Sequence, residues 1–156
     1  PPVHRPSGRR PKDAPARAPP APPPPPPTPP LAEVLASLQA GDYLALLAYL
    51  PRTPETTAAL QDLRLRLRDR HGVATTVGFG PRYLHSTGQL HKGGPPSGAF
   101  VQIVRDDPAD APVPGKPYTF AQLKAAQAQG DLEALLARGR RVARVTLEEL
   151  AAEAGA

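Results

Sequence analysis

The segment Tyr43-Leu-Ala-Leu-Leu-Ala-Tyr-Leu50 is apolar without alternation, and Pro51 ends it. A strand with one face in water alternates apolar and polar residues. A strand of a parallel sheet is covered on both faces and reads as a continuous apolar run. The segment therefore predicts a buried parallel strand with helices on both sides.

Strand-like and helical segments alternate on either side of this run. The apolar pattern predicts further strands at 73–77, 99–104 and 141–147, and helices at 31–38, 53–72, 119–139 and from 146. Thr53-Pro54-Glu55 and the capping box Thr119-Phe-Ala-Gln122 are N-terminal helix signals. This order predicts an α/β fold with a parallel sheet and helices on both faces, and such folds bind ligands beyond the C-terminal ends of their strands.

Polar residues are concentrated in Gly78-Phe-Gly-Pro-Arg-Tyr-Leu-His-Ser-Thr-Gly-Gln-Leu-His-Lys-Gly-Gly94, which follows a predicted strand. Glycine allows a backbone to approach a ligand closely and to adopt positive φ, while His and Lys transfer protons or hold anions. On a helix, His85 and Gln89 would share a face that Lys92 extends. We therefore expect this segment to form a ligand site.

Several other kinds of site are not indicated. The glycines match neither a dinucleotide fingerprint nor a P-loop, and Ser86 lies in no nucleophile elbow. His85 and His91 lack the spacing of metal ligands on a helix, so no metal site is expected. No apolar run is long enough to span a membrane, and the absence of cysteine is compatible with the cytoplasm.

Proline makes up half of residues 1–30, which predicts a disordered or polyproline II linker. This linker is either a ligand for a domain that binds proline-rich peptides or an uncommitted spacer. Most of the net charge of +5 lies here, where Arg and Lys outnumber the single carboxylate of Asp13. The rest of the chain is nearly neutral, so a dedicated nucleic-acid-binding domain is not expected.

The segment from Gly78 to Pro95 resembles phosphoglucose isomerase (glucose-6-phosphate isomerase) in the form that bacteria fuse behind transaldolase. Residues 41–51 and 118–131 resemble the same family, so the similarity covers about residues 31–150. The resemblance implies a sugar-isomerase α/β/α sandwich, of which residues 31–156 would be the C-terminal part. It also implies a cytoplasmic, cofactor-free enzyme of glycolysis and gluconeogenesis that interconverts glucose 6-phosphate and fructose 6-phosphate, and a homo-oligomer when complete.

The resemblance also implies roles for individual residues. The family's ring-opening histidine, in a His-x-x-x-Gln-Leu motif, corresponds to His85, and its late lysine corresponds to Lys124. Arg82, Gln89, His91 and Lys92 are expected to contact the sugar phosphate. His91-Lys92-Gly93 departs from the family's usual His-Gln-Gly.

The family's general-base glutamate and phosphate-binding Ser/Thr loop have no counterpart in this sequence. Moving a proton between C2 and C1 of a sugar requires a base near C2. We therefore expect the isolated chain to be inactive or nearly so, and to be a part of a longer protein. The alternative is a non-catalytic module that binds sugar phosphates or a protein partner and is tethered by its proline-rich arm.

Overall fold

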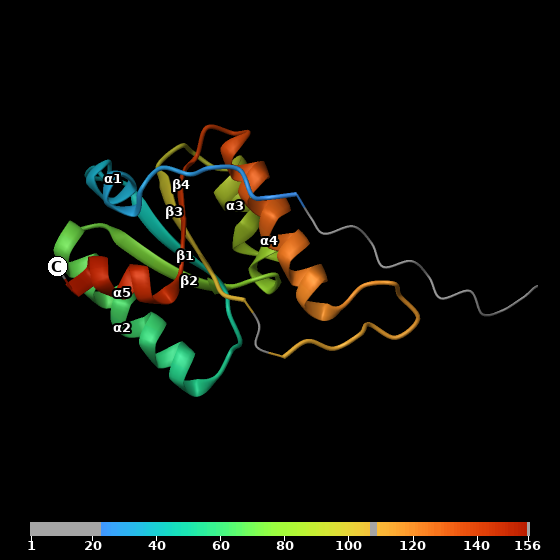
Figure 1. Ribbon diagram of the computed structural model, residues 1–156. Helices are drawn as coiled ribbons and strands as arrows, with labels where there is room; N and C mark the ends of the chain where they lie inside the picture. The colour runs from blue at the N-terminus through green and yellow to red at the C-terminus, as the bar shows by residue number, and fades with distance from the viewer. Residues whose placement is uncertain (1–22, 107–108, 156) are drawn as a thin grey trace, which may run out of the picture.

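Four parallel strands form the central sheet of the computed structural model, which describes residues 23–106 and 109–155. The strand order is β2-β1-β3-β4, with β1 and β3 in the centre (Figure 1). The strands are β1 (Tyr43–Tyr49), β2 (Ala74–Phe79), β3 (Gly98–Val104) and β4 (Arg141–Val145). In the register, Leu44 of β1 lies opposite Thr75 of β2 and Ala99 of β3. The predicted parallel sheet is confirmed.

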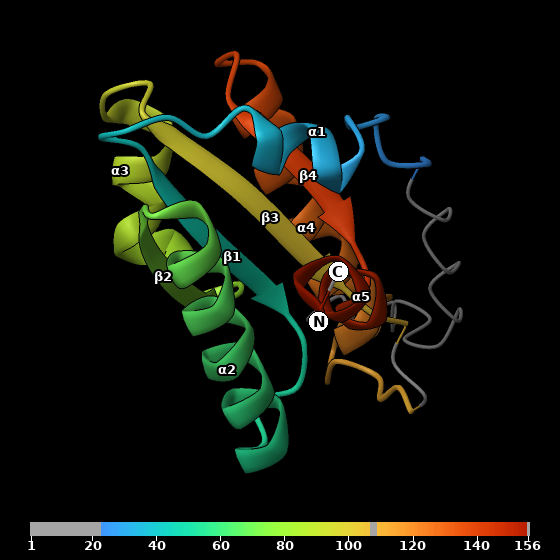
Figure 2. The same cartoon turned by 90° about the vertical axis from the view of Figure 1, so that its left-hand side faces the viewer.

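Helices cover both faces of the sheet, as predicted. One face carries α1 (Leu31–Ala36), α2 (Pro54–His71) and α5 (Leu147–Gly155); the other carries the 3₁₀ helix η1 (Arg82–His85), α3 (Thr87–Gly93) and α4 (Phe120–Leu136) (Figures 1 and 2). Alternate residues of β1 point into two separate cores. Leu44 and Leu46 pack beneath the first set of helices, and Leu47 and Tyr49 pack beneath the second. The unbroken apolar run of β1 is explained by this two-sided burial.

The helix signals act as expected. Thr53 Oγ1 accepts a hydrogen bond from the Thr56 backbone N–H, and α2 ends at Gly72 with a φ of 64°. Both bonds of the capping box between Thr119 and Gln122 form at the start of α4. Gly130 lies inside α4, which continues through it without a break to Leu136.

The glycines of residues 78–94 do not adopt the expected positive φ. Among the described residues, positive φ is found only at four glycines outside this segment, namely Gly41, Gly72, Gly115 and Gly139. Gly80, whose peptide bond to Pro81 is cis, lies against the ring of Tyr49, where an added Cβ would come within 2.6 Å of ring carbons. Gly78 and Gly80 permit close packing of the rings of Tyr83 and Tyr49.

The end of the expected linker contacts the sheet. The hydroxyl oxygen of Thr28 accepts a hydrogen bond of 3.1 Å from the backbone N–H of Arg144 on β4, which is an edge strand. Residues 1–22, which hold the rest of that linker, lie outside the described residues.

The two environments of glycine predict opposite effects of a methyl group. Gly80→Ala should lower the free energy of unfolding by about 1–3 kcal/mol, because the new Cβ would overlap the Tyr49 ring. Gly130→Ala should raise it by about 0.5–1 kcal/mol, because the residue lies inside α4 with nothing within 4 Å of its added Cβ. Urea denaturation measures both changes, and equal effects of the two substitutions would contradict the packing described.

Candidate functional site

A cavity of about 390 Å³ lies at the C-terminal ends of β1, β3 and β4. Tyr49 and Val104 line it from the ends of β1 and β3, and Lys124 lines it from α4. Its volume is within the range of small-molecule sites, and this edge of a parallel sheet is where α/β folds bind ligands. It is therefore the candidate ligand site.

Lys124 is positioned by the start of α4. Besides the capping box, Asp110 Oδ1 accepts a hydrogen bond of 2.9 Å from the Ala121 backbone N–H. The helix therefore begins at a defined place, and Lys124 lies one turn further along it. Lys124 also borders a second cavity, which Pro81 lines as well.

His85 lies at the end of η1, on the same face of the sheet as α4. Its side chain is exposed, and it does not line either cavity that Lys124 borders. Pro81, which immediately precedes η1, does line the second cavity. The structure thus brings the segment that carries His85 close to the helix that carries Lys124, but the two side chains do not share a cavity wall. Arg82 lies on η1 with His85, whereas Gln89 lies on α3, so His85 and Gln89 do not share the face of one helix as the sequence suggests. Neither Arg82 nor Gln89 lines either cavity.

His91 and Lys92 have partners inside the protein. His91 is 3% exposed, its Nδ1 is 3.1 Å from the Tyr43 hydroxyl, and its ring packs against Phe100. Lys92 Nζ forms an ion pair of 2.6 Å with Asp131 Oδ1 on α4. Contacts of His91 and Lys92 with a sugar phosphate stay predictions, and the fold already uses both side chains.

Asp131 is the centre of a buried polar network. Its carboxylate binds Lys92 and accepts a hydrogen bond from the Tyr83 hydroxyl, which is also 3.3 Å from the hydroxyl of Tyr49. Burial, followed by the nearby Asp131 charge, raises the pKa of Tyr83, so its hydroxyl stays protonated and donates. Because Tyr49 lines the candidate cavity, the network connects the cavity wall to the glycine-rich segment.

Arg144 enters the same cavity from β4 and was not singled out by the sequence. Its guanidinium Nη1 donates to Gln102 Oε1 at 2.9 Å, and Gln102 Nε2 donates to the Ala128 carbonyl at 2.8 Å. Burial lowers the pKa of Arg144 from its usual value. The signal that could have found this pair is a polar residue inside an apolar strand: Gln102 separates Val101 from Ile103.

Metal-binding clusters and membrane-spanning helices are not found in the described residues. In the part of the chain that the structure describes, no group of three or more His, Asp or Glu side chains is arranged to hold a metal ion. None of the helices in residues 23–106 and 109–155 has the length and apolar character needed to cross a bilayer.

Comparison with known proteins supports the fold alone. No family model matches the chain, and no curated protein matches it. Among solved structures it is similar to a hypothetical protein from Thermus thermophilus, with a TM-score of 0.56 and 21% sequence identity. The alignment covers 70% of this chain and 32% of the other, so this chain spans about a third of that protein's length.

The buried His91 predicts a pH dependence of stability. Burial, partly offset by the Asp131 charge, lowers the folded-state pKa of His91 below 6.5, so the unfolded chain takes up the proton first as pH falls. The free energy of unfolding should therefore decrease as pH falls through about 6.5. His91→Phe should flatten this decrease in urea midpoints measured across that range.

His71, whose pKa burial and Arg70 also lower, should account for the pH dependence that persists in His91→Phe. The exposed His85 supplies the matched control, since His85→Phe should leave the decrease unchanged. If the free energy of unfolding of His91→Phe decreases with falling pH as much as that of the wild type, His91 is not the source of the pH dependence.

Proposed function

We propose that this chain is the C-terminal part of an aldose–ketose isomerase that interconverts glucose 6-phosphate and fructose 6-phosphate. In this proposal Lys124 polarises oxygens of the sugar and His85 assists ring opening. The cytoplasmic location and the homo-oligomer implied by the resemblance belong to the same proposal.

The observation that carries the proposal is the position of Lys124. The resemblance implies a catalytic lysine at this position, and the residue borders a cavity of about 390 Å³ at the edge of the sheet where α/β folds bind ligands. An ammonium group there can donate hydrogen bonds to hydroxyl and carbonyl oxygens of a sugar. It stabilises the negative charge that develops on those oxygens when a proton leaves the adjacent carbon.

His85 supports the proposal less directly. The ring-opening step needs a group that gives a proton to the ring oxygen and takes one from the hydroxyl at C1, and an imidazole can do both near neutral pH. His85 lies on the same face as Lys124, on the segment that follows Pro81. In the proposal, a sugar bound against both cavities reaches Lys124 at one end and His85 at the other.

The proton transfer between C2 and C1 also requires a base. The carboxylate that lines the main cavity is Asp106, which is exposed, while Asp110 in the second cavity is engaged at the start of α4. The resemblance assigns the base to a glutamate that residues 31–150 do not contain. This favours the second candidate function, a sugar-phosphate-binding module that turns over no substrate by itself.

Binding of fructose 6-phosphate tests both candidate functions through Lys124. Lys124→Ala should weaken binding about tenfold or more in calorimetric titration of the full chain, because hydrogen bonds from a charged donor to the sugar are lost. Lys116→Ala, which removes an exposed lysine from the preceding loop, should leave the affinity unchanged.

A coupled assay then separates the two functions. We expect no measurable conversion of fructose 6-phosphate by the chain alone; conversion that is lost in Asp106→Asn would instead show that the chain contains its own base. Equal affinity of wild type and Lys124→Ala for the sugar phosphate, or no binding at all, would contradict the proposed function.

A further inference from the structure

Arg144 is a half-buried cation that lacks an acidic partner within the described residues. Of the described arginines, three others pair with carboxylates, including Arg66 with Asp62 and Arg141 with Asp42. The partly buried Arg140 bonds instead to backbone carbonyls at the end of α3. The side-chain bond of Arg144 goes to the neutral amide oxygen of Gln102. Withdrawing a guanidinium from water is costly unless an anion compensates its charge, so this arrangement indicates a missing negative group.

Gln102 fixes where Arg144 points. It is fully buried in β3, and its amide nitrogen is held by the Ala128 carbonyl of α4, so its oxygen faces the neighbouring strand and takes one N–H of Arg144. A guanidinium has five N–H donors, and this bond occupies one of them and anchors the Nη1 end of the group. Arg144 itself lines the cavity of about 390 Å³. The remaining donors are therefore available on the cavity side.

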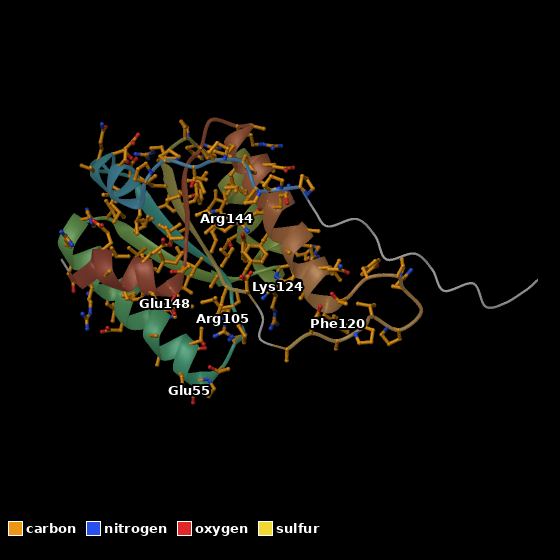
Figure 3. The ribbon with its side chains drawn as sticks, viewed as in Figure 1. Glu55, Arg105, Phe120, Lys124, Arg144 and Glu148 are labelled. Atoms are coloured by element: carbon orange, nitrogen blue, oxygen red, sulfur yellow. The ribbon has the colours of Figure 1, made fainter. Side chains whose placement is uncertain are left out.

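The rest of the cavity wall is also cationic. Arg105 and Lys124 line it from the end of β3 and from α4 (Figure 3), and Asp106 is the one carboxylate among the lining residues that the structure describes. Glu55 and Glu148, labelled in the same view, belong to α2 and α5 and do not line the cavity. Among the described lining residues, the Asp106 carboxylate does not balance the charges of Arg105 and Arg144 together, which favours an anionic ligand.

The N-terminus of α4 does not provide the anion site. Its first backbone N–H groups are bound already: Phe120 donates to the Ala111 carbonyl, Ala121 to Asp110 and Gln122 to Thr119. An anion in the cavity would therefore be bound by side chains.

We propose that Arg144, oriented by Gln102, binds the phosphate group of a phosphorylated ligand in this cavity, together with Arg105. The planar guanidinium fork matches two phosphate oxygens at once, and its low hydration suits a partly buried position. As a statement about a sugar phosphate, this assignment rests on the proposed function. It departs from the resemblance, which implies a Ser/Thr loop outside this sequence, by placing a phosphate near β4 with the sugar extending toward Lys124. The recognition of phosphate itself does not depend on isomerase activity.

The test is a titration of the ¹⁵N-labelled full chain with inorganic phosphate and with fructose 6-phosphate, followed by NMR at constant ionic strength set with sodium chloride. Saturable shifts should gather at residues 104–106, 121–125 and 144–146. Arg144→Gln should weaken the binding of both ligands about tenfold or more. The matched control Arg138→Gln, an exposed arginine beyond α4, should bind both as the wild type does.

Two further variants keep the test valid if Arg144→Gln unfolds the sheet. Arg105→Gln changes an exposed residue and should also weaken phosphate binding. Gln102→Leu removes no charge but should weaken phosphate binding too, because Arg144 loses the acceptor that orients it. Phosphate that does not bind the wild type, or that binds Arg144→Gln and Arg105→Gln as it binds Arg138→Gln, would overturn the assignment. A chain that binds phosphate through Arg144 but fructose 6-phosphate no better than phosphate would instead contradict the proposed function and leave this inference standing.

Discussion

The buried carboxylate of Asp131 is the constraint on which the sheet face covered by η1, α3 and α4 depends. A carboxylate that is 4% exposed cannot be tolerated without partners, and Asp131 has two, the Lys92 ammonium and the Tyr83 hydroxyl. Both partners come from residues 82–93, while Asp131 comes from α4. The need to compensate one buried charge therefore holds the glycine-rich segment against α4 and fixes the two segments that carry His85 and Lys124. Arg140 adds to this by donating to the Lys92 and Gly94 carbonyls at the end of α3.

Two polar systems lie on the same face, and they differ in how completely their charges are matched. The Asp131 network contains one acid, one base paired directly with it and a tyrosine hydroxyl bound to the acid, so it stabilises the structure without needing a ligand. Arg144 and Gln102 form the second system, which has a positive charge and a neutral acceptor. Tyr49 contacts both, since its hydroxyl meets Tyr83 and its ring lines the cavity beside Arg144. This difference separates residues that hold the fold from those available to a ligand.

Much of the fold could be predicted because its signals are local. The apolar run of β1 indicates burial on both faces, and the N-cap residues Thr53 and Thr119 begin their helices as their side chains require. The site was less predictable, because which partner a charged residue meets depends on tertiary contacts. Lys92 pairs with Asp131 of α4, which lies far along the chain, and Gly80 packs against the ring of Tyr49 in β1. Gln102 and Arg144 interrupt apolar strands, but the sequence does not show that they face each other across β3 and β4.

Amide hydrogen exchange in Asp131→Asn tests the central role of this carboxylate most directly. The account predicts that protection is lost at residues 82–93 and at the contacting turns of α4, because Lys92 and Tyr83 lose their charged partner. Protection in α2, which packs on the opposite face, should persist, and Asp62→Asn, which breaks an exposed pair with Arg66, should change neither region. Unchanged protection of residues 82–93 in Asp131→Asn, or an equal loss in α2, would contradict it.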